Sequence, residues 1–205
     1  MRHAIFSSNP SSSWYFSHGS GTSSFELAVV REHMDNYDFS ELTGLVVDDS
    51  RFMRQCLEQL LRALSVGEVI TAQNGFEAYD QCARHNPDFV FTDWDMEFQD
   101  GPTFVKRIRT DPESPNPFMP VIMLTGYAEH RRVLQARDFG VTEFVVKPIS
   151  AGVVYKRLVA LVDQPRPFVN SGAGYFGPCR RRIELAEYGC SNRRIQKPYE
   201  FEAAL

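Results

Sequence analysis

Short apolar runs alternate with helical patterns along the middle of the chain, from residue 42 onward. The apolar runs have the length and composition of buried strands, and they occupy residues 45–48, 68–71, 89–93, 121–125 and 143–147. Each run is followed by a segment in which apolar residues recur at three- and four-residue spacing, as on one face of a helix. We therefore predict an α/β fold of the (βα)₅ type, in which helices cover a doubly wound parallel five-stranded sheet. The fold is expected to end near residue 163.

The helical segments carry their own start and stop signals. Ser50 is placed to cap the first helix, whose apolar positions run from Met53 to Leu64. Asn74 followed by Glu77 resembles a capping box that opens the second helix, which is expected to end near residue 84. The other three helices are marked by Phe104, Val105 and Ile108, by Val133, Leu134 and Ala136 with a stop near Gly140, and by Val154, Leu158, Leu161 and Val162.

Two extensions of different composition flank this body. Residues 7–24 are rich in Ser and Gly and contain no Asp, Glu, Lys or Arg, which predicts a flexible N-terminal extension over residues 1–40. Residues 164–205 hold seven Arg or Lys against four Glu, a net charge of +3, whereas residues 1–163 carry 15 basic and 22 acidic side chains, a net charge of −7. The expected organisation is one folded domain over residues 41–163 and a basic tail with Arg, Gly and Pro over residues 164–205.

The cysteines and the hydropathy indicate the cellular compartment. Cys56, Cys82, Cys179 and Cys190 show no CxxC spacing and no secretory signal precedes them, so neither a disulfide framework nor a zinc finger is predicted. No apolar run approaches the ~20 residues needed to span a bilayer. We therefore expect a cytoplasmic protein without membrane insertion.

The unusual polar residues of the domain fall at the carboxyl ends of predicted strands. Asp48 and Asp49 close the first strand, Asp93 the third, Thr125 the fourth and Lys147 the fifth. Ligands of open parallel sheets bind at this edge, and three carboxylates in one small site require a cation such as Mg²⁺ or Mn²⁺. Asp93 can act as the nucleophile of a phosphoryl transfer, with the Lys147 charge and the Thr125 hydroxyl on the oxygens of the transferred group.

This order of residues, Asp-Asp, Asp, Thr and Lys-Pro on five successive strands, resembles the receiver domain of two-component response regulators. The resemblance extends over roughly residues 41–163 and implies the flavodoxin-like strand order 2-1-3-4-5. It rests on the motifs Leu45-Val-Val-Asp48-Asp49-Ser-Arg, Ala72-Gln-Asn-Gly75-Phe-Glu77-Ala, Thr92-Asp93-Trp-Asp95-Met96, Asp100-Gly101, Leu124-Thr125-Gly126 and Phe144-Val-Val-Lys147-Pro148.

The resemblance also implies roles for single residues. Asp49 and Asp93 are expected to bind Mg²⁺ directly, Asp48 to act through water, and the backbone carbonyl of Asp95 to complete the protein ligands. A cis peptide bond is expected before Pro148.

Other positions carry alternatives. Phe144 stands where the family places an aromatic switch residue that follows Thr125 on phosphorylation, but a plain core role fits it equally well. Trp94 could shield the phosphorylated aspartate or lie on the surface. Glu97 replaces the usual proline after Met96, and Tyr127, like Asp95, occupies a position where the family tunes dephosphorylation, so an altered phosphoryl lifetime is expected.

The function implied is that of a phosphorylation-activated switch of a bacterial phosphorelay, with no enzymatic activity beyond self-catalysed phosphotransfer and autodephosphorylation. A histidine kinase or a histidine phosphotransfer protein would phosphorylate Asp93. The face around the fourth helix, fifth strand and fifth helix would then engage a downstream protein or form a phosphorylation-dependent homodimer.

Two other functions stay open at this point. The sequence Asp93-Trp-Asp95 matches the nucleophile and acid pair of haloacid-dehalogenase-type phosphatases, but in those enzymes the metal-binding acidic pair follows the lysine, whereas Asp48 and Asp49 precede the nucleophile here. The basic tail could instead be the binding element, regulated by the acidic body. Its Arg clusters lack a recognition motif, which argues against nucleic-acid binding.

Overall fold

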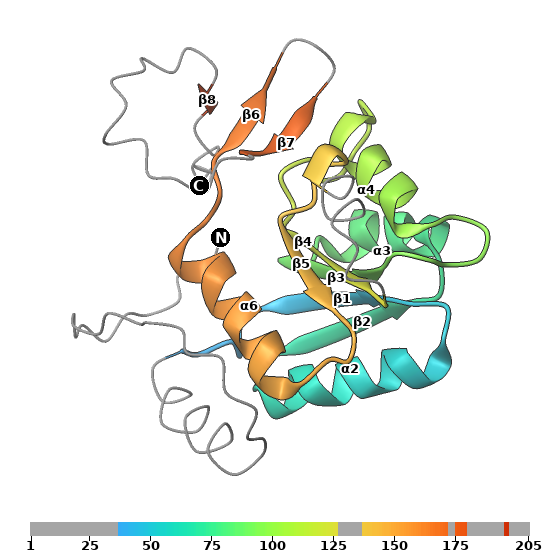
Figure 1. Cartoon of the computed structure of the whole chain (residues 1–205), viewed down its shortest axis with the longest axis vertical. Coiled ribbons are helices and arrows are strands. Elements are labelled where there is room, and N and C mark those ends of the chain that lie inside the picture. Colours follow the sequence, from blue (N-terminus) through green and yellow to red (C-terminus); the bar gives the residue numbers. More distant parts are fainter. Residues whose placement is uncertain (1–36, 127–136, 172–174, 180–194, 197–205) are drawn as a thin grey trace.

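The computed structural model describes residues 37–126, 137–171 and 175–179, together with the backbone of residues 195–196. Five parallel strands form the central sheet in the order β2-β1-β3-β4-β5 (Figure 1). Their bounds are β1 (Thr43–Val47), β2 (Glu68–Ala72), β3 (Phe89–Asp93), β4 (Val121–Thr125) and β5 (Glu143–Val146). The predicted α/β class and strand order are therefore confirmed.

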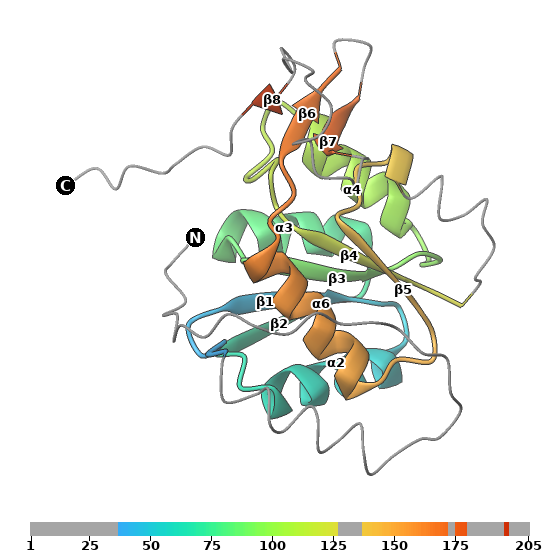
Figure 2. The same ribbon diagram turned by 60° about the vertical axis from the view of Figure 1, so that its left-hand side comes forward.

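The sheet is buried on both faces, as near-continuous apolar strands require. Every residue of β3 and β4 is buried, which matches their central place between β1 and β5. Figure 2 shows helices on both sides of the sheet. The helices are α2 (Arg51–Ala63) and α6 (Ala151–Asp163) on one face, and α3 (Gly75–His85) and α4 (Gly101–Thr110) on the other.

Two hydrophobic clusters fill the space between the sheet and these helix pairs. Leu45 and Val47 belong to the cluster on the side of α3 and α4, whereas Val46 belongs to the cluster on the side of α2 and α6. This alternation follows from the period of two along a strand. The helical faces predicted from sequence supply the other half of each cluster, with Phe104 and Ile108 in the first and Leu57 and Leu158 in the second.

Side-chain caps fix where the helices begin, close to the sheet edge that carries the candidate site. Ser50 accepts a hydrogen bond from the amide of Met53, and Asn74 accepts from the amides of Phe76 and Glu77, as the sequence predicted. Val133, Leu134 and Ala136 of the predicted fourth helix lie outside the described residues, as do residues 1–36 of the N-terminal extension. Within the described part of the chain, no helix is long and apolar enough to cross a membrane.

A short antiparallel hairpin, which was not predicted from the sequence, follows α6. Its strands are β6 (Phe168–Asn170) and β7 (Phe176–Pro178), and β8 (Ile195–Gln196) pairs with β6. The hairpin lies beside α4 in both ribbon views (Figures 1 and 2). The rings of Phe168 and Phe176 each have their centroid 5.2 Å from that of Phe118, in the loop before β4.

A buried arginine joins the hairpin to the domain. The Arg109 guanidinium, at the end of α4, donates to the carbonyls of Pro117, Met119 and Gly140 and lies 5.0 Å from the centroid of the Phe168 ring. Burial lowers the pKa of Arg109 to about 9, so the group stays charged at neutral pH. Gly140 has a φ of +88°, and a Cβ there would approach Arg109 to 3.1 Å, so a side chain would strain this contact.

The N-terminal side of the domain is also packed. Phe39 is buried and lies edge-on to Tyr155 of α6, and Tyr37 donates a hydrogen bond to Asp163 at the end of the same helix. Burial and the neighbouring Asp163 carboxylate raise the pKa of Tyr37 to about 12. Described residues that precede residue 41 therefore pack against α6.

Candidate metal centre

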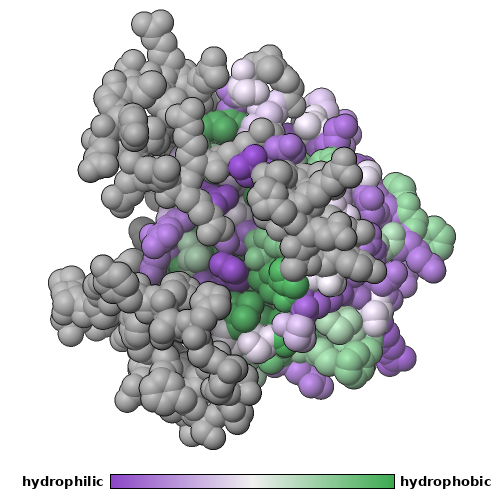
Figure 3. Space-filling model, in the orientation of Figure 1, coloured by the Kyte–Doolittle hydropathy of each residue, from purple (hydrophilic) through white to green (hydrophobic). Residues whose placement is uncertain are grey.

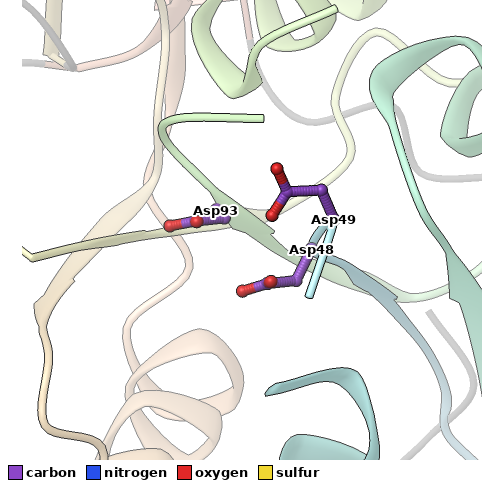
Figure 4. Close-up of side chains that lie close together, drawn as sticks. All are labelled: Asp48, Asp49 and Asp93. Carbon is purple, nitrogen blue, oxygen red and sulfur yellow. The ribbon is translucent and has the colours of Figure 1, made fainter. Parts of the chain in front are cut away.

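Three carboxylates meet at the carboxyl edge of the sheet. Asp48 and Asp49 are the first two residues after β1, and Asp93 ends the neighbouring strand β3. One oxygen of each carboxylate lies within 4.8 Å of the others, and Figure 4 shows the three side chains gathered at these two strand ends. Asp48 and Asp93 are buried, whereas Asp49 is exposed, so the group opens to solvent on the side of Asp49.

Close packing beneath Asp93 depends on a glycine. The first residue of α4 is Gly101, whose amide donates to the carbonyl of Trp94. A Cβ at this position would lie 2.1 Å from the backbone oxygen of Asp93, a distance that no side chain can adopt. The glycine thus lets α4 begin directly against the strand end that carries Asp93.

Lys147 reaches the buried carboxylates from the end of β5. Its Nζ lies 3.0 Å from Oδ1 of Asp93 and 3.2 Å from Oδ2 of Asp48, and its backbone amide donates to the carbonyl of Thr125 over 2.7 Å. Burial by itself would lower the pKa of Lys147, but the hydrogen bonds and charges of Asp93 and Asp48 outweigh burial and raise it. The ammonium group therefore remains charged beside Asp93.

Asp93 experiences opposing influences. Burial raises its pKa most, and the charge of Asp48 raises it further, while Lys147 and the amide of Trp94 lower it. That amide donates to Oδ1 of Asp93 over 2.9 Å. The net pKa lies above the ordinary value of an aspartate, because burial disfavours the charged carboxylate more than Lys147 and the Trp94 amide favour it.

Backbone groups orient the other two aspartates. The amide of Ser50 donates to Oδ1 of Asp48 over 2.9 Å, and the amide of Glu97 donates to Oδ2 of Asp49 over 3.3 Å. Arg54, in the first turns of α2, donates from Nη1 to the carbonyl oxygens of both aspartates. Arg54 could not be singled out from the sequence, because a bond to backbone carbonyls requires no particular spacing pattern.

The structure locates four more of the residues singled out from the sequence. Thr125 is buried at the end of β4, next to β3. Trp94 is also buried, so the alternative of a surface aromatic is wrong. Asp95 follows in the exposed loop after β3, and the part of its backbone in metal binding stays a prediction. Phe144 is partly buried against the cluster on the side of α3 and α4.

One further expectation from sequence, the cis peptide bond, has a clear outcome in the structure. The peptide bond between Lys147 and Pro148 is cis, as predicted. Cys56, Cys82 and Cys179 are free thiols, and Cys190 and Tyr127 lie outside the described residues.

The donor set suits a hard divalent cation. Within the described residues the cluster offers carboxylate oxygens and no thiol or imidazole, which favours Mg²⁺ or Mn²⁺ over softer metals. Mg²⁺ commonly uses one or two carboxylates and keeps other positions for water and phosphate oxygens. The exposed side at Asp49 leaves room for such ligands, so the residues present fit this ion.

Comparison with known proteins identifies relatives of the domain. The response regulator receiver domain family matches residues 45–159. The chemotaxis protein CheY-3 of Vibrio cholerae is 34% identical over 120 residues, covering 58% of this chain and 91% of that protein. The chemotaxis protein CheY of Pseudomonas aeruginosa is 31% identical over 120 residues, covering 58% and 95%.

Solved structures show the same fold. The chemotaxis protein CheY4 of Vibrio cholerae superposes with a TM-score of 0.54 at 30% identity, covering 58% of this chain and 96% of that chain. CheY of Borrelia burgdorferi, in a complex with CheX, BeF₃ and Mg²⁺, superposes with a TM-score of 0.52 at 28% identity, covering 58% and 88%.

Proposed function

The chain belongs to the response regulator receiver domain family, and from this premise we propose that it is a signalling switch that accepts a phosphoryl group on Asp93. The observation that carries the proposal is the contact of Asp93 with Lys147 at 3.0 Å, within an acidic cluster at the carboxyl edge of the sheet. Receiver domains are regulated by histidine kinases or phosphotransfer proteins, and we infer a phosphohistidine of such a protein as the donor.

The transfer requires one nucleophile and compensation of charge. An oxygen of the Asp93 carboxylate attacks phosphorus while the bond from phosphorus to the histidine nitrogen breaks. The electron pair of that bond stays on the ring, which leaves as neutral imidazole because its other nitrogen already carries a proton. Lys147 is close enough to donate to an oxygen of the transferred group once that group displaces part of its contact with Asp93. Thr125, at the end of the adjacent strand, is proposed to donate its hydroxyl to another of these oxygens.

We propose that Mg²⁺ is held by Asp49 and Asp93, by Asp48 through water, and by the backbone carbonyl of Asp95. The cation would neutralise charge that builds up between the carboxylates and the phosphoryl oxygens. The fit of the oxygen donor set supports this assignment, and the Borrelia burgdorferi relative was solved in a complex with BeF₃ and Mg²⁺.

The partner surface is proposed to lie around β5 and α6, on the side of the sheet edge where Lys147 sits. Figure 3 shows hydrophobic side chains gathered on the face that carries these two elements, and Val146 of β5 is 40% exposed. An exposed apolar patch of this kind favours protein contact. We propose that phosphorylation moves Thr125 and Phe144 and so changes the affinity of this face for a downstream protein.

A small-molecule phosphoryl donor tests the proposal without knowledge of the kinase. The protein is incubated with phosphoramidate and Mg²⁺, and its intact mass is measured. We expect the wild type to gain one phosphoryl group, Asp93→Asn to gain none, and Asp80→Asn, an exposed aspartate on α3, to behave as the wild type. A wild type that gains no phosphoryl group, or an Asp93→Asn variant that still does, would overturn the proposed function.

A further inference from the structure

A single nitrogen of Arg54 bridges the two aspartates that follow β1. Nη1 donates to the carbonyl oxygen of Asp48 over 2.6 Å and to that of Asp49 over 3.1 Å. Arg54 is partly buried in α2 and contacts no carboxylate through these bonds. Its role must therefore pass through the backbone of the acidic loop.

The backbone turn at this point is what brings both carboxylates into one site. In an extended strand, successive side chains point to opposite faces of the sheet, so Asp48 and Asp49 would diverge. Their carboxylates instead lie within 4.8 Å of each other and of Asp93. The chain must turn between the two residues to achieve this.

Two sets of hydrogen bonds hold that turn. The last sheet bond of β1 is the amide of Asp48 to the carbonyl of Ala72, and beyond it the carbonyls have no strand partner in the described ladder. The Asp48 carboxylate accepts from the amide of Ser50, which closes the turn from one side. Arg54 draws two successive carbonyls, which would point in opposite directions in a strand, to one nitrogen.

We propose that Arg54 is a positioning residue of the metal site, one that sets the affinity for the divalent cation by fixing the turn at Asp48 and Asp49. This inference rests on the proposed function, since it concerns the same site. Its hydrogen bonds reach backbone carbonyls, so Arg54 would act through the backbone and not as a metal ligand. Residues that orient metal ligands in this way typically change metal affinity by about 10- to 100-fold when they are replaced.

The chain offers a matched control for the charge. Arg51 lies on the same helix, one turn earlier, and is exposed to solvent. Arg51→Ala removes the same positive charge near the acidic loop as Arg54→Ala, but it leaves the carbonyl bonds in place. Arg54→Lys keeps the charge and offers one ammonium nitrogen that can donate to both carbonyls.

Mg²⁺ affinity is measured directly, without a phosphoryl donor. The second tryptophan, Trp14, is replaced by Phe in all variants, so that the fluorescence of Trp94 beside Asp93 reports on the titration. We expect Arg54→Ala to raise the Mg²⁺ dissociation constant about 10-fold, Arg54→Lys to raise it less, and Arg51→Ala to change it less than about 2-fold. The deficit in the rate of phosphorylation by phosphoramidate in Arg54→Ala should shrink as the Mg²⁺ concentration is raised toward saturation, because the defect lies in metal affinity.

The outcomes separate the two proposals. Equal Mg²⁺ affinity in Arg54→Ala and Arg51→Ala overturns the positioning role, as does an Arg54→Ala variant with a lower melting temperature and wild-type affinity. In either case the proposed function stands if the wild type binds Mg²⁺ and is phosphorylated. A wild type that neither binds Mg²⁺ nor accepts a phosphoryl group removes the basis of both.

Discussion

Replacing Asp49 by Asn should stabilise the metal-free protein and weaken the response of its stability to Mg²⁺. The change is nearly isosteric, and the Asn carbonyl can still accept the amide of Glu97. Asp49 forms no ion pair with a basic side chain among the described residues. The nearby Lys147 pairs with Asp48 and Asp93 instead. The substitution therefore removes repulsion between carboxylates without breaking an ion pair.

The size of the effect follows from the spacing of the carboxylates. Two unit charges 4.8 Å apart, the upper limit for these carboxylate oxygens, repel each other by about 1 kcal/mol in water and by about 3.5 kcal/mol at an effective dielectric constant of ~20. Asp49 is exposed, so the lower figure applies. In EDTA we expect Asp49→Asn to raise the free energy of unfolding by about 1 kcal/mol.

Magnesium should reverse which of the two proteins has the higher free energy of unfolding. At a Mg²⁺ concentration about 100 times the dissociation constant, binding stabilises the wild type by about 2.7 kcal/mol. Asp49→Asn lacks a proposed direct ligand and should gain little, so the wild type would be the more stable protein by roughly 1.7 kcal/mol.

Urea unfolding in EDTA and in Mg²⁺ measures both quantities, with Asp80→Asn as the control for loss of one negative charge away from the site. We expect Asp80→Asn to follow the wild type in both conditions. The reasoning is refuted if Asp49→Asn is no more stable than the wild type in EDTA, or if Asp80→Asn shows the same gain.

Three further predictions address the hairpin, the nucleophile and a buried thiol. Arg109→Ala leaves three carbonyls without their donor, and urea unfolding should show a free energy of unfolding lower by about 3 kcal/mol. In a double-mutant cycle, Arg109→Ala and Phe168→Ala should show a coupling energy of about 0.5–2 kcal/mol. Strict additivity of the two effects would argue against a contact between these side chains. The raised pKa of Asp93 predicts how the rate of phosphorylation by phosphoramidate depends on pH at a low, fixed Mg²⁺ concentration. The rate should fall as the pH decreases, with a midpoint above ~3.9. A midpoint at or below that value would contradict the raised pKa. Burial raises the pKa of Cys82 to about 12, so iodoacetamide should alkylate Cys56 well before Cys82 in the native protein. Peptide mapping measures both rates, which should become alike in urea. Equal rates in the native protein would show that Cys82 is accessible.

The sheet could be predicted from sequence because each strand is a short apolar run with its own local signature. The ranges of β3 and β4 agree with the prediction residue for residue, whereas β1 begins at Thr43, two residues earlier than predicted. The pairing of Thr43 with Glu68 extends the strand beyond its apolar run, and such pairing is a tertiary effect. The candidate site residues could be named for a related reason, since a polar residue directly after a buried strand stands out, and their functional roles stay predictions.

The hairpin after α6 could not be predicted in the same way. Its strands have three residues each and include Gly177 and Pro178, so they show no period of two. What holds them are contacts with Phe118 and Arg109, which lie far away in sequence. The boundaries placed at residues 40 and 163 remain predictions.

Stability and chemistry are separated along the strands of this domain. At the carboxyl edge, burial raises the pKa of Asp93, and Lys147 bonds to two aspartates at once. Repulsion between the clustered carboxylates opposes folding in the absence of a cation, and under the proposed function a bound cation and phosphoryl oxygens would offset that repulsion. The compensating burial lies in the two hydrophobic clusters and in the aromatic contacts of Phe168 with Phe118, before β4, so variants there should change stability without changing metal affinity.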